Sequence, residues 1–218
     1  MAWNAMEINP EMLNKVLEKM GVGSGWRFVD VLGLETEPLS SVPKPACAMM
    51  LLFPLTQQHE AFREKQAVDP DTKAYFLKQT ITNSCGTVGV VHAVANNQDK
   101  IEFGSGSVLK AFLDATADMS PADRAKQLES NKLIHGIHDE VAAAGQCSVA
   151  EDKVNFHFIT FVSDNGQLYE LDGRMEGPVN HGATSDDTFI MDAAKICNQF
   201  VAREKNEVRF SAVALSKA

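Results

Sequence analysis

The apolar residues that follow residue 9 recur at helical spacing. Asn9-Pro10-Glu11 combines a capping side chain, a proline at the first helical position and an acid in the first turn. Gly21 is a typical residue just beyond a helix C-terminus. One helix is therefore expected here, with an apolar face made of Met12, Leu13, Val16, Leu17 and Met20.

Further along the chain, apolar runs typical of strands alternate with helical patterns. A helix is expected from near Asn83 to Ala95, with Val88, Val91 and His92 on its buried face together with Ala95. The pattern is helical again between about 107 and 144, and Ser120-Pro121 marks a helix start within it. The other expected elements are strands at Trp26–Val31, Ala46–Leu55, Val154–Val162, Gln167–Asp172 and Val208–Leu215, and helices at Thr56–Lys65 and about 187–203.

No internal repeat, low-complexity tract or clean linker divides the chain. The expected architecture is a single α+β domain over residues 1–218, with a mostly antiparallel sheet flanked by helices. The segment from Ala142 to Asp152 carries small and polar residues with little periodicity, so we expect a connection there.

Composition excludes several classes of function. The chain has no run of 18 apolar residues and no visible secretory signal, so a cytoplasmic protein is expected. The formal charge of -9 argues against nonspecific binding to nucleic acid or to acidic membranes, and mildly favours a basic ligand. The last four residues contain no cysteine, so no prenyl anchor and no stable membrane attachment is expected.

The cysteines differ in their sequence context. All four are expected to be free thiols of a reducing compartment, Cys47 and Cys197 as small core residues and Cys147 in a loop. Cys85 differs, because it lies between small polar residues and a glycine where a helix begins, in Thr80-Ile81-Thr82-Asn83-Ser84-Cys85-Gly86-Thr87. A helix N-terminus favours a thiolate and offers N–H groups to an oxyanion, so Cys85 is a candidate nucleophile.

Five of the six histidines are poor partners for such a nucleophile. His92 lies seven residues along the same helix, about 10 Å away at 1.5 Å per residue. His135 and His138 form an i,i+3 pair, and a solvated helix face explains them better than a metal site. His59 is expected at the surface, and His181 in a loop is a weak candidate.

His157 is the strongest candidate base. Strand alternation places it on the face opposite Phe156 and Phe158, and a turn-rich segment predicts a hairpin to the next strand. A four-residue loop would set His157 directly opposite Asp172, whereas a two-residue Asn165-Gly166 loop would leave them diagonal on one face. Both registers allow the carboxylate to orient the imidazole.

These residues suggest the constellation of a thiol hydrolase. Cys85 would attack, His157 would transfer the proton and Asp172 would fix the imidazole, while Gln79 could donate to the oxyanion. Ordinary roles remain open at this point: a satisfied strand histidine, a turn aspartate before Gly173 and a surface glutamine.

Three segments that contain these residues resemble the signatures of ubiquitin carboxyl-terminal hydrolases. They are residues 79–87 (QTITNSCGT), 155–158 (NFHF) and 168–174 (LYELDGR). The resemblance extends over essentially the whole chain, and residues 6–15 resemble a vertebrate isozyme of that family in particular. It implies a papain-like fold with a knotted backbone, which no sequence pattern predicts because knots are rare.

The resemblance also implies roles for individual residues. It gives Cys85, His157, Asp172 and Gln79 the roles of nucleophile, base, orienting residue and oxyanion stabiliser, with no metal and no cofactor. It makes residues 139–153 a crossover loop over the active site. Implied ubiquitin contacts are Met6, Glu7, Ile8, Asn9, Pro10, Glu207, Val208, Arg209, Phe210, Ser211 and Ala212.

The expected function is therefore hydrolysis of small adducts or peptides from the C-terminal glycine of ubiquitin, through a thioester on Cys85. The expected partner is ubiquitin, with the protein a monomer or at most a weak dimer. A protein that mainly binds and protects monoubiquitin is the first alternative. A Cys-His-Asp enzyme acting on another acyl group or on a ubiquitin-like modifier is the second.

Overall fold

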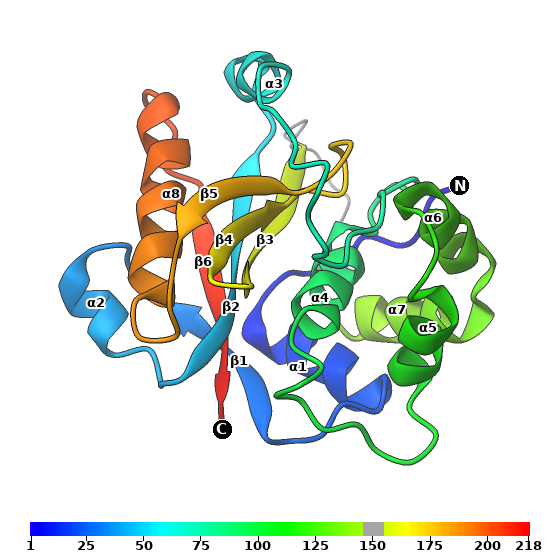
Figure 1. Cartoon of the computed structure of the whole chain (residues 1–218). Helices are drawn as coiled ribbons and strands as arrows, with labels where there is room; N and C mark the ends of the chain where they lie inside the picture. The colour runs from blue at the N-terminus through cyan, green and yellow to red at the C-terminus, as the bar shows by residue number, and fades with distance from the viewer. Residues whose placement is uncertain (146–154) are drawn as a thin grey trace.

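A computed structural model of the chain describes residues 1–145 and 155–218. Within these residues the strands form one antiparallel sheet in the order β1-β6-β2-β3-β4-β5 (Figure 1). The strands are β1 (Trp26–Val31), β2 (Ala46–Pro54), β3 (Phe156–Asp164), β4 (Gln167–Leu171), β5 (Val179–Ala183) and β6 (Ser211–Lys217).

Helices cover both faces of this sheet (Figure 1). The group that includes α1, α4, α5 and α7 lies on one face, and α2 and α8 lie on the other. The helices are α1 (Pro10–Lys19), α2 (Thr36–Ser40), α3 (Gln57–Arg63), α4 (Cys85–Ala95), α5 (Val108–Thr116), α6 (Pro121–Ser130), α7 (Lys132–Ala144) and α8 (Phe189–Arg203).

Strand alternation divides the core between the two faces. On β2, Met50 joins the cluster beside α1 and α4, while its neighbours Met49 and Leu51 join the cluster beside α8. The central strands are therefore buried on both sides, which explains why β2 is a nearly continuous apolar run.

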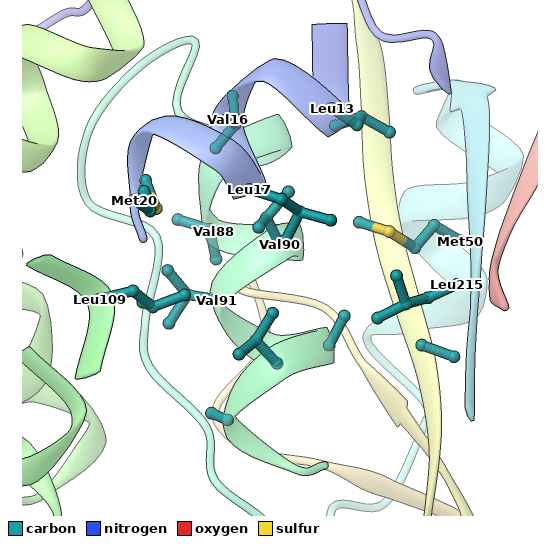
Figure 2. Close-up of a cluster of buried hydrophobic side chains, with 14 of the residues drawn as sticks. Leu13, Val16, Leu17, Met20, Met50, Val88, Val90, Val91, Leu109 and Leu215 are labelled. Carbon is teal, nitrogen blue, oxygen red and sulfur yellow. The ribbon is translucent and has the colours of Figure 1, made fainter. Parts of the chain in front are cut away.

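Helix α4 is buried on all sides between the sheet and α1 (Figure 2). The expectation of a single buried face was wrong, because every residue from Gly86 to Ala95 is buried. A Cβ on Gly89 would stand 2.6 Å from the Met50 Cε atom, so this glycine allows the helix to approach the sheet closely. The surrounding core holds the first turn of α4, and with it Cys85, in a fixed place.

The structure confirms most of the elements expected from the sequence pattern. Two were missed, α2 and β5, because each has five residues and neither shows a clear apolar period. The last strand begins at Ser211 rather than at Val208, and β3 begins at Phe156.

The expected crossover loop over 139–153 begins too early. Helix α7 continues to Ala144, because Val141 and Ala142 extend its buried stripe and alanine is the strongest helix former. Residues 146–153 of that prediction lie outside the described residues, and the knotted backbone stays a prediction. Within the described residues, no helix is both long enough and apolar enough to span a bilayer.

Candidate active site

Cys85 is the first residue of α4 and is partly exposed. In the part of the chain that the structure describes, no side chain caps this helix, since the Ser84 hydroxyl donates instead to the Ile81 carbonyl at 2.7 Å. The loop before it turns at Asn83, whose φ of 67° lies in the left-handed region that asparagine tolerates. The Cys85 thiol therefore stands at an uncapped helix N-terminus, which favours negative charge.

His157 and Asp172 form a buried hydrogen-bonded pair. The His157 Nε2 atom lies 2.6 Å from Asp172 Oδ1, and each residue is only 2% exposed. The other ring nitrogen, Nδ1, is left to face the sulfur of Cys85, with which His157 also interacts. The structure thus brings together the three side chains that the sequence proposed as nucleophile, base and orienting carboxylate.

The hairpin between β3 and β4 has the shorter of the two loops considered. Asp164 pairs with Gln167, so the loop is Asn165-Gly166, and both residues have positive φ, 49° and 72°. This is the geometry of a type I′ turn, which suits the twist of a hairpin. His157 and Asp172 are consequently diagonal neighbours.

Charge separation within the pair is favoured. Burial lowers the pKa of His157, but the Asp172 charge and hydrogen bonds with Asp172 and Cys85 outweigh it and raise the pKa to about 9. Burial raises the pKa of Asp172, yet the charge and hydrogen bond of His157, the Arg174 backbone N–H and the charge of Arg63 lower it to about 2. An imidazolium beside a carboxylate is therefore the resting form near neutral pH.

A second layer of side chains lies behind this pair. The ring of Phe53 contacts His157 edge-on at 5.9 Å and the ring of His59 at 4.6 Å. The Arg63 Nη1 atom lies 3.9 Å from Asp172 Oδ2. These residues were missed by sequence reasoning, since no pattern indicates that α3 packs against residue 172.

The expectation that His59 is a surface residue was wrong. It is buried, and burial lowers its pKa to about 4. Its i,i+4 spacing from Arg63 on α3 is the one signal that both side chains share a face.

Gln79 lines the same cleft as Cys85 and His157. Its backbone N–H donates to the Gly173 carbonyl at 2.7 Å, which ties it to the residue after Asp172. Its Oε1 atom is buried and has no hydrogen-bond partner among the described residues. This glutamine is therefore held by its backbone in the cleft that Cys85 lines, and its side-chain Nε2 donates to the Ile81 carbonyl at 3.4 Å.

Two adjoining hollows meet at Cys85. A polar cleft of about 230 Å³ contains Cys85, His157, Gln79 and Arg174. A more apolar groove of about 380 Å³ shares Cys85 and is lined also by Ala5, Met6, Glu7, Ile8, Leu52, Asn83, Gly86, Asn155 and Phe156. An extended chain that reaches Cys85 could occupy both.

The predicted partner-contact residues divide into two groups around this groove. Met6, Glu7 and Ile8 line it directly, whereas Asn9 and Pro10 cap and begin α1. In the second group Val208 is 87% exposed and the Arg209 guanidinium lies 5.6 Å from the ring centroid of Phe156. Glu207 pairs with Arg209, Phe210 packs partly on the α8-side core, Ser211 begins β6, and Ala212 is buried in the sheet.

The other histidines have structural partners. His92 is fully buried and its Nε2 accepts from the Leu77 N–H, while His181 pairs with Glu170 at 3.0 Å. The expected solvated face for His135 and His138 was wrong, because His138 is fully buried and His135 stacks on Trp3. No group of three potential metal ligands occurs among the described residues.

Two of the remaining cysteines are buried free thiols, as expected. Burial raises the pKa of Cys47 to about 12 and raises that of Cys197 as well, so neither forms a thiolate near neutral pH. The expected loop position of Cys147 lies outside the described residues.

Comparison with known proteins gives the chain a family. Residues 3–202 match the family model described as ubiquitin carboxyl-terminal hydrolase, family 1. Ubiquitin carboxyl-terminal hydrolase isozyme L1 of Homo sapiens is 65% identical over 218 residues, covering 98% of this chain and 97% of that protein. The same isozyme of Rattus norvegicus is 64% identical over the same shares of both chains.

Solved structures agree with the fold. The catalytic domain of Trichinella spiralis UCH37 bound to ubiquitin vinyl methyl ester has a TM-score of 0.83, covering 100% of this chain and 97% of that one. A second structure, of Trichinella spiralis UCH37 bound to the same compound, has a TM-score of 0.78 and covers 99% and 82%. At 23% and 24% identity, these likenesses establish the fold alone.

Proposed function

Because the chain belongs to family 1 of the ubiquitin carboxyl-terminal hydrolases, we propose that it cleaves small adducts and peptides from the C-terminal glycine of ubiquitin. The observation that carries this proposal is the contact of Cys85, at the start of α4, with the buried His157–Asp172 pair. The relatives named isozyme L1 support the same activity.

The reaction proceeds through two acyl transfers. The Cys85 thiol passes its proton to His157 and the sulfur attacks the carbonyl carbon of the terminal glycine, and the oxyanion accepts hydrogen bonds from the Cys85 backbone N–H and the Gln79 amide. His157 gives its proton to the departing amine or alcohol, which leaves a thioester on Cys85. Water then loses a proton to His157, attacks the thioester and releases the carboxylate with the regenerated thiol.

The same proposal assigns the binding surface. The ubiquitin tail approaches Cys85 along the groove beside Met6, Glu7 and Ile8, with further contacts at Asn9–Pro10 and residues 207–212. That tail is basic near its end, and the net charge of -9 is complementary to it. Free thiols at Cys47, Cys85 and Cys197 support a reducing compartment, and we propose the cytoplasm and a monomeric enzyme.

Turnover of a fluorogenic amide of the ubiquitin C-terminus, measured beside binding of free ubiquitin, tests the proposal. The intact protein should release the fluorophore, and Cys85→Ala should abolish release while keeping ubiquitin binding. Tight binding with negligible release by the intact protein would instead indicate a ubiquitin-holding role. A protein that neither binds ubiquitin nor releases the fluorophore would refute both.

A further inference from the structure

His138 lies where three parts of the chain meet beside the nucleophile. It belongs to α7 and is fully buried. Its Nδ1 atom lies 2.7 Å from the Thr87 hydroxyl on α4, and its Nε2 atom lies 2.8 Å from the Asn4 carbonyl in the N-terminal segment. It takes no part in the proton transfers of the proposed reaction.

These two contacts fix the protonation of the ring. The Asn4 carbonyl only accepts, so Nε2 must carry a proton and donate. In the neutral ring Nδ1 then accepts from the Thr87 hydroxyl. Burial lowers the pKa of His138, the interaction with Asp139 raises it and that with His135 lowers it, and the net shift is downward. The neutral imidazole therefore connects Thr87 to Asn4, accepting a hydrogen bond at Nδ1 and donating one at Nε2.

Thr87 connects this link to the reacting thiol. It is fully buried in the first turn of α4, two residues after Cys85. That turn supplies both the sulfur and one of the donors proposed for the oxyanion, the Cys85 backbone N–H. A shift of Thr87 would therefore move the nucleophile relative to His157.

The N-terminal segment is itself joined to the loop that precedes Cys85. The Trp3 N–H donates to the Thr82 carbonyl at 2.9 Å, and the Asn83 amide donates to the Trp3 carbonyl at 3.0 Å. The Trp3 ring stacks on His135, with 4.8 Å between ring centroids, and also contacts His138. Residues 3–4 thus form one packed unit with the nucleophile loop and α7.

We infer that neutral His138 is a positioning residue, which sets Cys85 in line with His157 by tying Thr87 on α4 to the Asn4 carbonyl. The inference rests on the proposed function and adds a regulatory consequence to it. Residues 6–8, which line the groove, follow closely after Asn4. A displacement of the N-terminal segment would therefore disturb the His138–Asn4 hydrogen bond and, through it, the alignment of the nucleophile.

Two changes at Thr87 and one control elsewhere test the link. Thr87→Val removes the hydroxyl and keeps the shape, and we expect kcat on the ubiquitin amide to fall at least about tenfold with KM within about twofold. Thr87→Ser keeps the hydroxyl and should restore kcat to within about twofold of the original. Thr160→Val is the matched control, since the buried Thr160 hydroxyl donates at 3.1 Å to the carbonyl of Gly89, which lies on the same helix about one turn from Cys85.

The control separates a specific effect on the position of Cys85 from a general loss of packing around α4. Equal losses of kcat in Thr87→Val and Thr160→Val, or full kcat in Thr87→Val, would overturn the inference. His138→Gln should lose as much as Thr87→Val, and the double variant should lose no more than either single one, because both break one link. Losses that multiply in the double variant would also overturn it.

A readout without ubiquitin keeps this inference apart from the proposed function. Alkylation of Cys85 by iodoacetamide, followed on the peptide that contains it, reports how the thiol is set against His157. We expect slower alkylation in Thr87→Val and unchanged rates in Thr87→Ser and Thr160→Val. An unchanged rate in Thr87→Val would count against the His138 link even if the protein proved inactive on ubiquitin.

Discussion

Asp172 holds His157 from a diagonal position in the hairpin. The register between β3 and β4 ends with Thr160 opposite Leu171, and its continuation would set the next residue, Asp172, opposite Ile159, two residues from His157. The carboxylate nevertheless reaches Nε2 at 2.6 Å. Because Asp172 takes Nε2, the Nδ1 atom of His157 stays available for the interaction with Cys85 at the start of α4.

The first prediction concerns Asp172→Asn. The amide keeps the size of the side chain but cannot stabilise an imidazolium, so kcat on the ubiquitin amide should fall by about 10² to 10⁴. Free ubiquitin should bind with little change, because Asp172 is buried and does not line either hollow around Cys85. Nearly full turnover by this variant would show that His157 needs no orienting carboxylate.

The pH dependence of kcat/KM provides the second prediction. His157 has its pKa raised to about 9, so the imidazolium that donates to the leaving group is present at neutral pH and lost as pH rises through about 9. The alkaline decline should therefore centre near pH 9. In Asp172→Asn the carboxylate that raises the pKa of His157 is gone, whereas burial still lowers this pKa. The alkaline decline should therefore move to lower pH. An identical alkaline limb in both proteins would contradict this account.

Sequence reasoning selected Cys85, His157 and Asp172, which the structure places together, because their signals are local. Cys85 stands at a helix start with small polar residues before it, and the Asn165-Gly166 turn limits the hairpin to a few registers. Either even-length loop places His157 and Asp172 on one face, so the pairing did not depend on choosing between them.

The supporting side chains could not be predicted in the same way. His59 sits among polar residues on a short helix, and its burial depends on where α3 packs, against Phe53 and the distant Phe200. His138 differs, because it continues the buried stripe of α7 four residues after Ile134, and only its partner, the Asn4 carbonyl, depends on long-range packing. Long-range packing leaves no periodic trace in the sequence.

The third prediction uses the close approach of Gly173 to Gln79. A Cβ on Gly173 would stand 2.8 Å from Gln79 Cβ and 3.2 Å from its backbone nitrogen, so Gly173→Ala must displace the proposed oxyanion donor. A displacement near 1 Å at a reacting group can cost about 100-fold, and we expect kcat to fall by roughly 10- to 100-fold. The kcat of Gly173→Ala on the fluorogenic ubiquitin amide measures this loss.

Gly177→Ala is the matched control for that change. Its Cβ would meet Val68 at 3.6 Å, an ordinary contact, so kcat should stay within about twofold. Equal kcat in Gly173→Ala and Gly177→Ala would show that Gln79 tolerates the shift or that its amide does not serve the oxyanion.

The fourth prediction concerns acid stability and His92. Burial lowers the pKa of this histidine to about 4, below its ordinary 6.5, so the unfolded chain binds its proton first as pH falls. The stability that depends on neutral His92 is full above about pH 6.5 and is lost toward pH 4. His92→Gln keeps an acceptor for the Leu77 N–H but does not titrate. Urea unfolding measures the free energy of unfolding at pH 7 and at pH 5. The decrease in this free energy from pH 7 to pH 5 should be smaller by roughly 2 kcal/mol in the variant than in the original protein. Equal losses in the two proteins would mean that His92 is already protonated or solvated in the folded state.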